Sequence, residues 1–395
     1  MRRFPPISGV GEGLTAFSGH SLTTTPRYST DGLAAFATSL LSAAGMDDDK
    51  ARTVARLLVL TDMMGRRTHG LAIVPLYIDD IRKGSMQVTG QPEVVKDGEA
   101  TLLWDGAYLP GLWLVNRAID VAVERIARCG VVSVSIRRSH HIGCLAALVK
   151  QAADRGLVAI IFNSDPAGQR VAPYGGTQPL FTPNPFAIGY PGRDHPVLVD
   201  ICASITTVSM TRQKFAAGEM FEHPWLLDAA GNPTCDPAVL ENTEPRGSLQ
   251  LVGGQEYGHK GFGLALMIEA LSQGLSGHGR RDAPTRWGGN VFLQVIDPDF
   301  FAGRDAFTEQ MDFLSEKCRA NRPIRPGQPV RVPGDQAARG IATAMREGVT
   351  FDAQSWDGIA RCARDLGVAL PPAVDHAGRY GAVLATPRSE SSAAR

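Results

Sequence analysis

Hydrophobic positions recur along the chain with two different periods. Apolar residues three and four positions apart predict amphipathic helices over residues 33–44, 51–64, 73–81 and 115–129. Continuous β-branched runs predict buried strands instead, and a turn at Asp97-Gly98 predicts a strand on either side of it. The buried strands are expected at residues 131–136, 156–162 and 197–200. Strands that alternate with helices are typical of an α/β protein.

The second half of the chain continues both patterns. Residues 290–298 alternate as a strand, and helices are expected over 303–319, 336–347 and 355–366. The segment 262–271 is apolar on nearly every face, which predicts a helix buried at the centre of a domain.

Both ends of the chain have a different composition. Residues 1–27 are rich in Gly, Pro, Ser and Thr and predict a flexible N-terminal extension. Residues 373–395 are mostly small and predict a mobile tail.

Composition narrows the class of partner. The 395 residues suffice for about two domains, and 40 basic residues balance 40 acidic ones. This balance gives no electrostatic footprint for nucleic acid or an anionic membrane, and no apolar run reaches the roughly 18 residues of a membrane span. Six scattered cysteines without a CxxC pair argue against a disulfide framework or a zinc site. We therefore expect a cytoplasmic protein that acts on a small molecule, without a metal.

A histidine pair follows the strand predicted at 131–136, in Ser139-His140-His141-Ile142-Gly143, and a helix is expected after it. Loops between strands and helices often carry function. The dipole and the unpaired N–H groups of the following helix disfavour imidazolium, so we expect His141 to be neutral at pH 7. The alternative interpretation, which this stretch taken alone favours, is a structural histidine that caps backbone groups.

A third histidine, His69, lies at a helix junction beside Thr68 and is followed by Gly70. Taken alone, this junction is also consistent with a structural role. Further along, the Gly-rich stretch 253–261 contains His259 and Lys260 and precedes the apolar helix. Such a loop suits an anion such as a dinucleotide phosphate, although the spacing is not that of a Walker A loop, and a capping loop is the alternative.

In this order, the motifs resemble those of the malate/L-lactate dehydrogenase family of non-Rossmann NAD(P)-dependent oxidoreductases. Its members include 2-oxo acid, ureidoglycolate, diketogulonate and Δ1-piperideine-2-carboxylate reductases or dehydrogenases. The resemblance runs from about Ser29 to Gly367. The matching stretches are Thr68-His69-Gly70 with Pro75 and Tyr77, Ser139 to Gly143, Asn163-Ser164, Thr182 to Pro185, Asp200 to Ser204, Lys260 to Ala265 and Val332 to Asp335.

The resemblance implies a cofactor domain on a mainly antiparallel sheet, at residues 106–317. It also implies a helical substrate and dimerisation domain formed by residues 28–105 and 318–372, and a homodimer. The expected activity is transfer of a hydride from NADH or NADPH to a C=O or C=N group of a small ketone, 2-oxo acid or cyclic imine.

The resemblance also assigns site residues. His69 and His141 are the expected catalytic histidines, one of them as proton donor or acceptor, and Thr68 is expected to bond the same substrate oxygen. The residues expected to contact the cofactor are Ser139, Asn163, Asn184, Asp200, Ile201, Cys202, Ala203, His259, Lys260, Gly334 and Asp335.

The chain departs from the family at the substrate carboxylate. The family has an arginine where this chain has Ile73, and an isoleucine cannot bind a carboxylate. Either the substrate lacks that carboxylate, or another arginine binds it, with Arg66, Arg67 and Arg138 as candidates. The family's lysine is also replaced, by Met210. These departures leave an alternative open, namely a redox-inactive relative that binds a ligand or transfers a proton.

Overall fold

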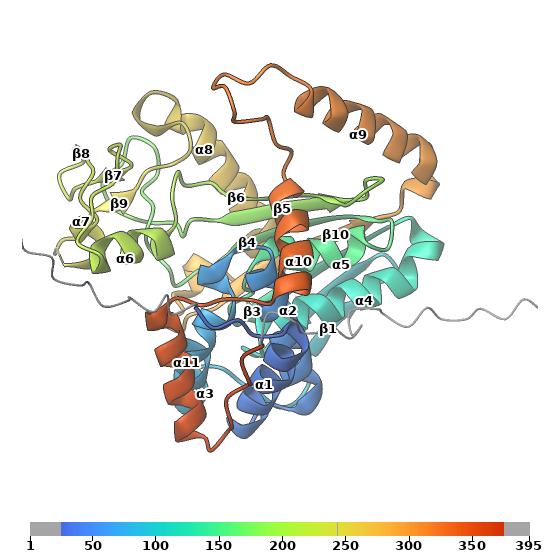
Figure 1. The fold of residues 1–395 in the computed structure, drawn as a ribbon. Helices are drawn as coiled ribbons and strands as arrows, with labels where there is room; N and C mark the ends of the chain where they lie inside the picture. Colours follow the sequence, from blue (N-terminus) through green and yellow to red (C-terminus); the bar gives the residue numbers. More distant parts are fainter. Residues whose placement is uncertain (1–24, 243, 375–395) are drawn as a thin grey trace, which may run out of the picture.

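A seven-stranded sheet crosses the middle of the molecule, in the order β1-β2-β3-β10-β4-β5-β6 (Figure 1). The computed structural model describes residues 25–242 and 244–374. Among the paired strands of this sheet only β2 and β3 run parallel, and the other neighbours are antiparallel. The expected α/β fold with a mainly antiparallel sheet is therefore confirmed. The strands are Glu93–Asp97 (β1), Thr101–Asp105 (β2), Val131–Ser139 (β3), Val158–Ser164 (β4), Pro185–Tyr190 (β5), Val197–Cys202 (β6) and Gly289–Ile296 (β10).

Two helices cover one face of this sheet. Helix α4 (Gly111–Cys129) packs on β3 and β10, and α5 (Leu145–Ala153) packs on β4 and β5. The side chains of α5 are almost entirely apolar and buried, so burial of this face stabilises the centre of the fold. Helix α4 ends at Gly130, whose backbone is left-handed (φ 69°). A Cβ at Gly130 would also lie 2.5 Å from the Phe300 ring, so only glycine fits there.

Helices from the two ends of the described chain pack against one another. Helix α10 contacts α2, and α11 contacts α3 (Figure 1). Tyr28 stacks on Trp356 with 4.2 Å between the ring centroids, and Ser29 caps α1 by accepting the N–H of Gly32. The predicted helices are thus present as α1 (Thr30–Ala43), α2 (Asp48–Met63), α3 (Val74–Arg82), α10 (Asp335–Glu347) and α11 (Ala353–Asp365).

Strands β1 and β2 follow helices α1 to α3 in the chain and belong to the seven-stranded sheet. They belong to the segment 28–105 that the sequence assigns to the helical domain, yet β2 pairs with β3 along five residue pairs. The predicted boundary between the helical domain and the cofactor domain, at residue 105, therefore falls inside one continuous sheet. This division into two domains stays a prediction.

A smaller layer lies beside the sheet. Strands β7 (Leu226–Leu227), β8 (Pro233–Thr234) and β9 (Ser248–Leu249) form a three-stranded sheet. Helix α6 (Val208–Ala216) packs on α7 (Ala238–Glu241) in the same region. A second buried cluster around Leu226, Leu249 and Ile268 holds this layer to helix α8 (Gly254–Glu269).

Helix α8 differs from the prediction in two respects. The expected Gly-rich loop begins as a helical turn at Gly254 that kinks at Tyr257 (φ −120°, ψ 17°), so Lys260 lies within the helix that follows the kink and not in a loop ahead of it. The expected complete burial is also wrong, since Leu266 is 49% and Met267 41% exposed. The buried face of α8 is built mostly from small residues, because Gly261 lies against the backbone of Val252 and has no room for a Cβ.

The chain ends lie largely outside the described residues. The flexible extension predicted at 1–27 and the tail predicted at 373–395 fall mostly in segments 1–24 and 375–395. The innermost residues of both are ordered, because the N–H of Val374 donates to the carbonyl of Arg27. In the described part of the chain, no helix is long and apolar enough to cross a membrane.

Candidate active site

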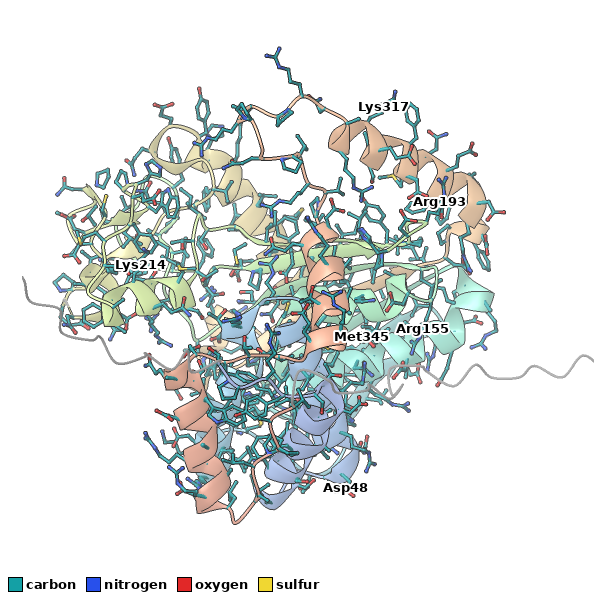
Figure 2. All side chains as sticks on the ribbon, viewed as in Figure 1. Asp48, Arg155, Arg193, Lys214, Lys317 and Met345 are labelled. Atoms are coloured by element: carbon teal, nitrogen blue, oxygen red, sulfur yellow. The ribbon has the colours of Figure 1, made fainter. Side chains whose placement is uncertain are left out.

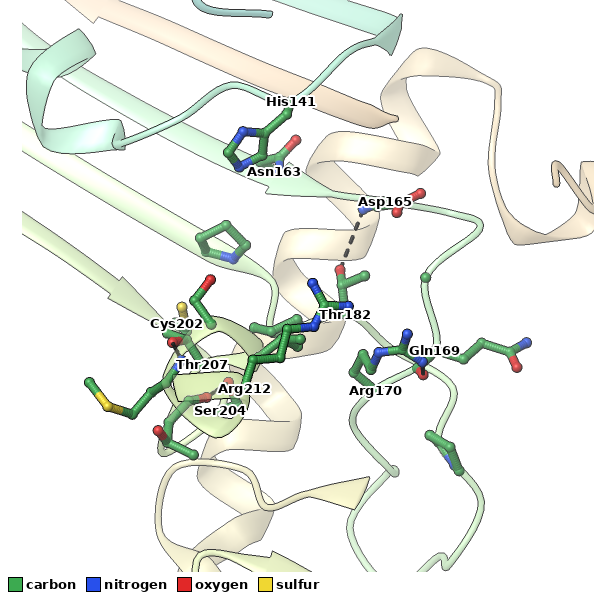
Figure 3. A pocket seen from close by; sticks show the side chains of 18 of the residues that line it. His141, Asn163, Asp165, Gln169, Arg170, Thr182, Cys202, Ser204, Thr207 and Arg212 are labelled. Atoms are coloured by element: carbon green, nitrogen blue, oxygen red, sulfur yellow. Dashed lines mark hydrogen bonds between the residues drawn. The ribbon is translucent and has the colours of Figure 1, made fainter. Parts of the chain in front are cut away.

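An open cavity of about 1470 Å³ runs from the first histidine turn to the small three-stranded layer (Figure 3). Its walls come from the 66–76 turns, the 141–145 loop, the segment 163–185, the end of β6 and helix α6. It exceeds the roughly 300–1,000 Å³ of a typical small-molecule site. The cavity therefore has room for a large ligand together with a small one.

Two 3₁₀ turns, Arg67–His69 and Leu71–Ile73, position His69. The carboxylate of buried Asp62 accepts the N–H of Leu71 at 2.8 Å and fixes the junction between these turns. Gly70 lies directly against this carboxylate, since a Cβ there would approach Asp62 Oδ1 to 2.0 Å. The local sequence thus requires glycine after the histidine, and Thr68 Oγ1 lies 2.9 Å from His69 Nδ1.

His141 lies on the opposite wall, at the start of the loop between β3 and α5. Its Nδ1 is 2.9 Å from the phenol oxygen of Tyr77, and its ring stacks on Trp287 with centroids 5.1 Å apart. The rings of His69 and His141 are 5.8 Å apart, centroid to centroid. The structure therefore brings the two predicted catalytic histidines together in one cavity.

Both histidines favour the neutral form. Burial lowers the pKa of His141 well below its ordinary value, and the neighbouring His69 and His140 lower it further. Burial also lowers the pKa of His69, against an opposing effect of Asp200. The expected neutral His141 is thus supported, but burial replaces the helix dipole as the main cause.

The start of α5 is already bonded to a carboxylate. The N–H of Ala146 donates to Asp200 at 3.0 Å, and Cys144 Sγ lies 3.5 Å from the same oxygen. Burial raises the pKa of the Cys144 and Cys202 thiols to about 12. Both cysteines therefore remain thiols near neutral pH, which argues against cysteine nucleophilic catalysis in this cavity.

His140 lies outside the lining of the cavity that His69 and His141 share. It is completely buried, its Nε2 lies 3.4 Å from Asp80, and its ring meets Trp287 edge to face. Its contacts are those of a residue that shapes the loop.

The residues expected to contact the cofactor fall into two groups. Four of them line the cavity, namely Asn163, Asp200, Ile201 and Cys202. The others lie outside its lining in this chain, namely Ser139, Asn184, Ala203, His259, Lys260, Gly334 and Asp335. The second group supports neighbouring structure, as when Asn184 donates to Glu269, or is paired elsewhere, as when Asp335 meets Arg319 and His195.

The residues predicted to contact the substrate also differ in whether they line the cavity. Arg66 lines the cavity, whereas Arg67 donates to Thr350 and Arg138 pairs with buried Asp105. Ile73 packs against the main hydrophobic core and does not line the cavity.

The cavity wall contains residues that the sequence did not reveal, and Trp287 and three arginines are prominent among them. Trp287 precedes Gly288 and Gly289 where β10 begins, and an aromatic residue in such a turn was the available signal. Arg170, Arg212 and Arg246 are far apart in the chain, and their sequence neighbourhoods gave no signal.

The donors in the cavity fit a nicotinamide dinucleotide. Ser204, Thr206 and Thr207 line the cavity with hydroxyl-bearing side chains, and the backbone N–H groups that begin α6 follow Thr207 directly. Hydroxyls and N–H groups suit ribose and phosphate oxygens. Among residues 25–242 and 244–374, no cluster of three or more His, Cys, Asp or Glu side chains could hold a metal ion.

Comparison with known proteins gives a consistent result. The family pattern described as malate/L-lactate dehydrogenase matches residues 28–360. The chain is 30% identical to L-lactate dehydrogenase of Cupriavidus necator over 344 residues, which cover 85% of this chain and 97% of that one. It is 28% identical to hydroxycarboxylate dehydrogenase B of Escherichia coli over 349 residues, covering 87% of this chain and 95% of that one.

A solved structure shows the same fold. The Δ1-piperideine-2-carboxylate reductase of Pseudomonas syringae pvar. tomato is 25% identical with a TM-score of 0.75, and the match covers 86% of this chain and all of that one. The family match spans most of the chain, and the relatives are named as dehydrogenases. The chain therefore belongs to the malate/L-lactate dehydrogenase family and is an NAD(P)-dependent dehydrogenase.

Proposed function

We propose that this enzyme transfers a hydride between a nicotinamide dinucleotide and a C=O or C=N group of a small substrate, with His141 as proton donor and acceptor. The observation that carries the proposal is the facing pair of half-buried histidines, with ring centroids 5.8 Å apart, in one cavity with Thr68. The dinucleotide, when bound, supplies or takes up the hydride. The remaining requirement is a proton, which a histidine can exchange near neutral pH.

The contacts of His141 support its role. Burial raises the pKa of Tyr77 above its ordinary value, so the phenol stays uncharged and its oxygen can accept a hydrogen bond from Nδ1–H of His141. With the proton of neutral His141 on Nδ1, Nε2 is the nitrogen that exchanges a proton with the substrate. A neutral His141 accepts the hydroxyl or amine proton during oxidation, and it must gain a proton before it acts as the acid in reduction. Such general acid–base catalysis typically contributes about 10²- to 10⁴-fold.

His69 and Thr68 have a polarising role in this proposal. Thr68 Oγ1 bonds His69 Nδ1 and so orients the ring, which leaves Nε2 available to the substrate. A hydrogen bond from His69 to the reacting oxygen or nitrogen stabilises the charge that develops there.

Arg66 is the proposed partner of a substrate carboxylate. It lines the cavity close enough to His69 to influence its pKa, and within the described chain it has no carboxylate at ion-pair distance. Arg67 and Arg138 have partners elsewhere. The preferred substrates of this proposal are therefore 2-oxo acids and cyclic imine carboxylates, and their reduced counterparts.

We further propose a homodimer that uses the surface of α8, α9 (Arg304–Arg319) and the segment after α9. Both helices lie in the upper part of Figure 1, α8 on the left and α9 on the right. Their large apolar side chains are exposed, and such patches mark interaction surfaces. The residues are Leu266 and Met267 on α8, Phe313 and Leu314 on α9, and Ile324 after α9. A cytoplasmic location agrees with six cysteines that are free in the structure.

Substitution of the two histidines tests the proposal. His141→Ala and His69→Ala should each reduce kcat by at least about 100-fold in a screen of cofactor oxidation against 2-oxo acids, cyclic imines and uncharged ketones. Fluorescence titration should show that NADH or NADPH still binds to both variants. His223→Ala, outside the cavity lining, is the matched control. Normal turnover in both variants would refute the role of the histidines.

The redox-inactive alternative is not favoured by relatives that are named as dehydrogenases. The same titration separates the two cases, because a redox-inactive relative would bind neither NADH nor NADPH or would bind without turnover of any substrate.

A further inference from the structure

Three arginines from separate segments meet on the cavity wall away from the histidines. Arg170 lies in the segment between β4 and β5, Arg212 on α6, and Arg246 just before β9. Figure 3 shows Arg170 and Arg212 near Thr182, with His141 at the other end of the view. The cluster therefore belongs to the same cavity as the reacting centre but not to that centre itself.

The positive charge of this cluster is only partly balanced. Arg212 lies 3.7 Å from Glu241, and Arg246 lies 3.2 Å from the largely exposed Glu244. Arg170 has no carboxylate within ion-pair distance among the described residues, and its guanidinium bonds only the carbonyl of its neighbour Gln169. Partial burial lowers the pKa of Arg170, and the charges of Arg246 and Arg212 lower it further. Like charges gathered in this way favour a bound anion.

The backbone holds Arg170 in place. Its N–H donates to the carbonyl of Phe181 at 2.7 Å, and its carbonyl accepts the N–H of Leu249 at 2.9 Å. This residue is thus fixed between a loop and β9 although its guanidinium has no charged partner. A fixed backbone reduces the entropy lost when a ligand binds.

Arginine is suited to one class of anion in particular. Its planar guanidinium donates paired N–H groups to phosphate oxygens, and two or three such groups can surround a terminal phosphate. A cavity that also accommodates a dinucleotide offers two sources for that phosphate, namely the 2′-phosphate of NADPH or a phosphorylated end of the substrate.

We propose that Arg170, Arg212 and Arg246 form an anion subsite that binds a phosphomonoester at the end of the cavity opposite His141. This inference rests on the proposed function in one respect, because it assumes that a nicotinamide dinucleotide binds in the same cavity. If the phosphate is that of the cofactor, the subsite makes the enzyme selective for NADPH over NADH.

Calorimetric binding of 2′,5′-ADP and 5′-ADP to the full-length protein at fixed salt tests the subsite without turnover. Wild type is compared with Arg170→Gln and Arg212→Gln. The matched control is Arg193→Gln, which removes the same charge from an exposed arginine outside the cavity lining. In Figure 2, Lys214 marks helix α6, which also carries Arg212. The control residue Arg193 lies on the opposite side of that view. Circular dichroism melts establish that the variants fold. Because Arg212 is exposed, Arg212→Gln still tests the subsite even if Arg170→Gln does not fold.

The expected result is that wild type binds 2′,5′-ADP at least about tenfold more tightly than 5′-ADP, and that both cavity variants lose this preference while the control keeps it. That outcome assigns the phosphate to the cofactor. If the two nucleotides bind equally, titration with inorganic phosphate decides the source. Phosphate binding that is lost in both cavity variants and does not compete with NADH assigns it to the substrate.

The inference is overturned if neither probe distinguishes wild type from the cavity variants, or if Arg193→Gln has the same effect as they do. The proposed hydride transfer can still stand in that case, because it depends on the histidine variants and their turnover. Conversely, loss of the subsite signal with normal turnover would leave the proposed function intact.

Discussion

The phenol oxygen of Tyr77 lies 2.9 Å from Nδ1 of His141, whose ring also stacks on Trp287. Tyr77 comes from α3, whereas His141 follows β3, so the contact joins the N-terminal helices to the sheet. Tyr77 is fully buried, and its ring also meets the His140 ring edge to face. In the proposed mechanism this contact occupies Nδ1 of His141 and leaves Nε2 for the substrate.

Tyr77→Phe should therefore lower kcat by about 3- to 10-fold, the amount expected for one hydrogen bond of roughly 0.5–1.5 kcal/mol. The ring volume is kept, so thermal unfolding should change little. Steady-state kinetics and a melting curve measure both. A variant with wild-type kcat and pH profile would show that the contact does not orient His141.

The pH dependence should differ between the two reaction directions. Burial lowers the pKa of His141 well below its ordinary value, so the neutral base predominates at pH 7. For oxidation, kcat/KM should rise as pH increases through this lowered pKa and then level off. For reduction it should fall over the same range, because imidazolium is lost. Profiles measured in both directions check the sign, and an oxidation rate that declines from pH 5 to 7 would contradict it.

Arg66→Gln should raise KM for 2-oxo acids by about 10- to 100-fold, because a charge-assisted hydrogen bond contributes roughly 1.5–3 kcal/mol. Uncharged ketones should be affected much less. Arg67→Gln is a neighbouring control that removes the same charge from a side chain bonded to Thr350 outside the cavity. Equal effects of the two variants would remove Arg66 from the proposed substrate site.

Stability should depend on pH through Asp62. Burial raises the pKa of its carboxyl to about 7, above the 3.8 of an exposed aspartate. Between these values the folded state binds a proton that the unfolded state lacks, so this group makes the free energy of unfolding decrease as pH rises from about 4 to 7. Asp62→Asn should flatten that dependence while it keeps an acceptor for the N–H of Leu71. Urea unfolding at pH 5 and pH 8 measures how the free energy of unfolding changes with pH in the wild type and in Asp62→Asn. The same change in both proteins would refute the raised pKa of Asp62.

Association through the α8–α9 surface should be sensitive to charge. Ile324→Glu and Leu314→Glu place a carboxylate among the exposed apolar residues and should shift sedimentation from dimer toward monomer. Met220→Glu, on the segment after α6 and about as exposed as Leu314, is the control. A wild-type protein that sediments as a monomer at micromolar concentration would refute the proposed dimer.

Local sequence was sufficient for most elements of secondary structure. The apolar spacing over residues 33–44, the turn at Asp97-Gly98 and the apolar run before Ser139 predicted α1, the strands β1 and β2, and β3, because each signal acts within a few residues. The expected antiparallel fold came from the family resemblance, since the spacing of strands does not reveal their order. In the structure β10 lies between β3 and β4, far from both in the chain.

The sequence by itself determined the candidate histidines, the departure at Ile73 and the element types around them. Only the tertiary structure decided that His69 faces His141, that Arg138 is paired with Asp105, and that Arg170, Arg212 and Arg246 share one wall. It also decided that α8 begins at Gly254 and exposes Leu266. The physical reason is that periodicity reports which side of an element is apolar, whereas charge pairing and cavity walls depend on contacts between segments far apart in the chain.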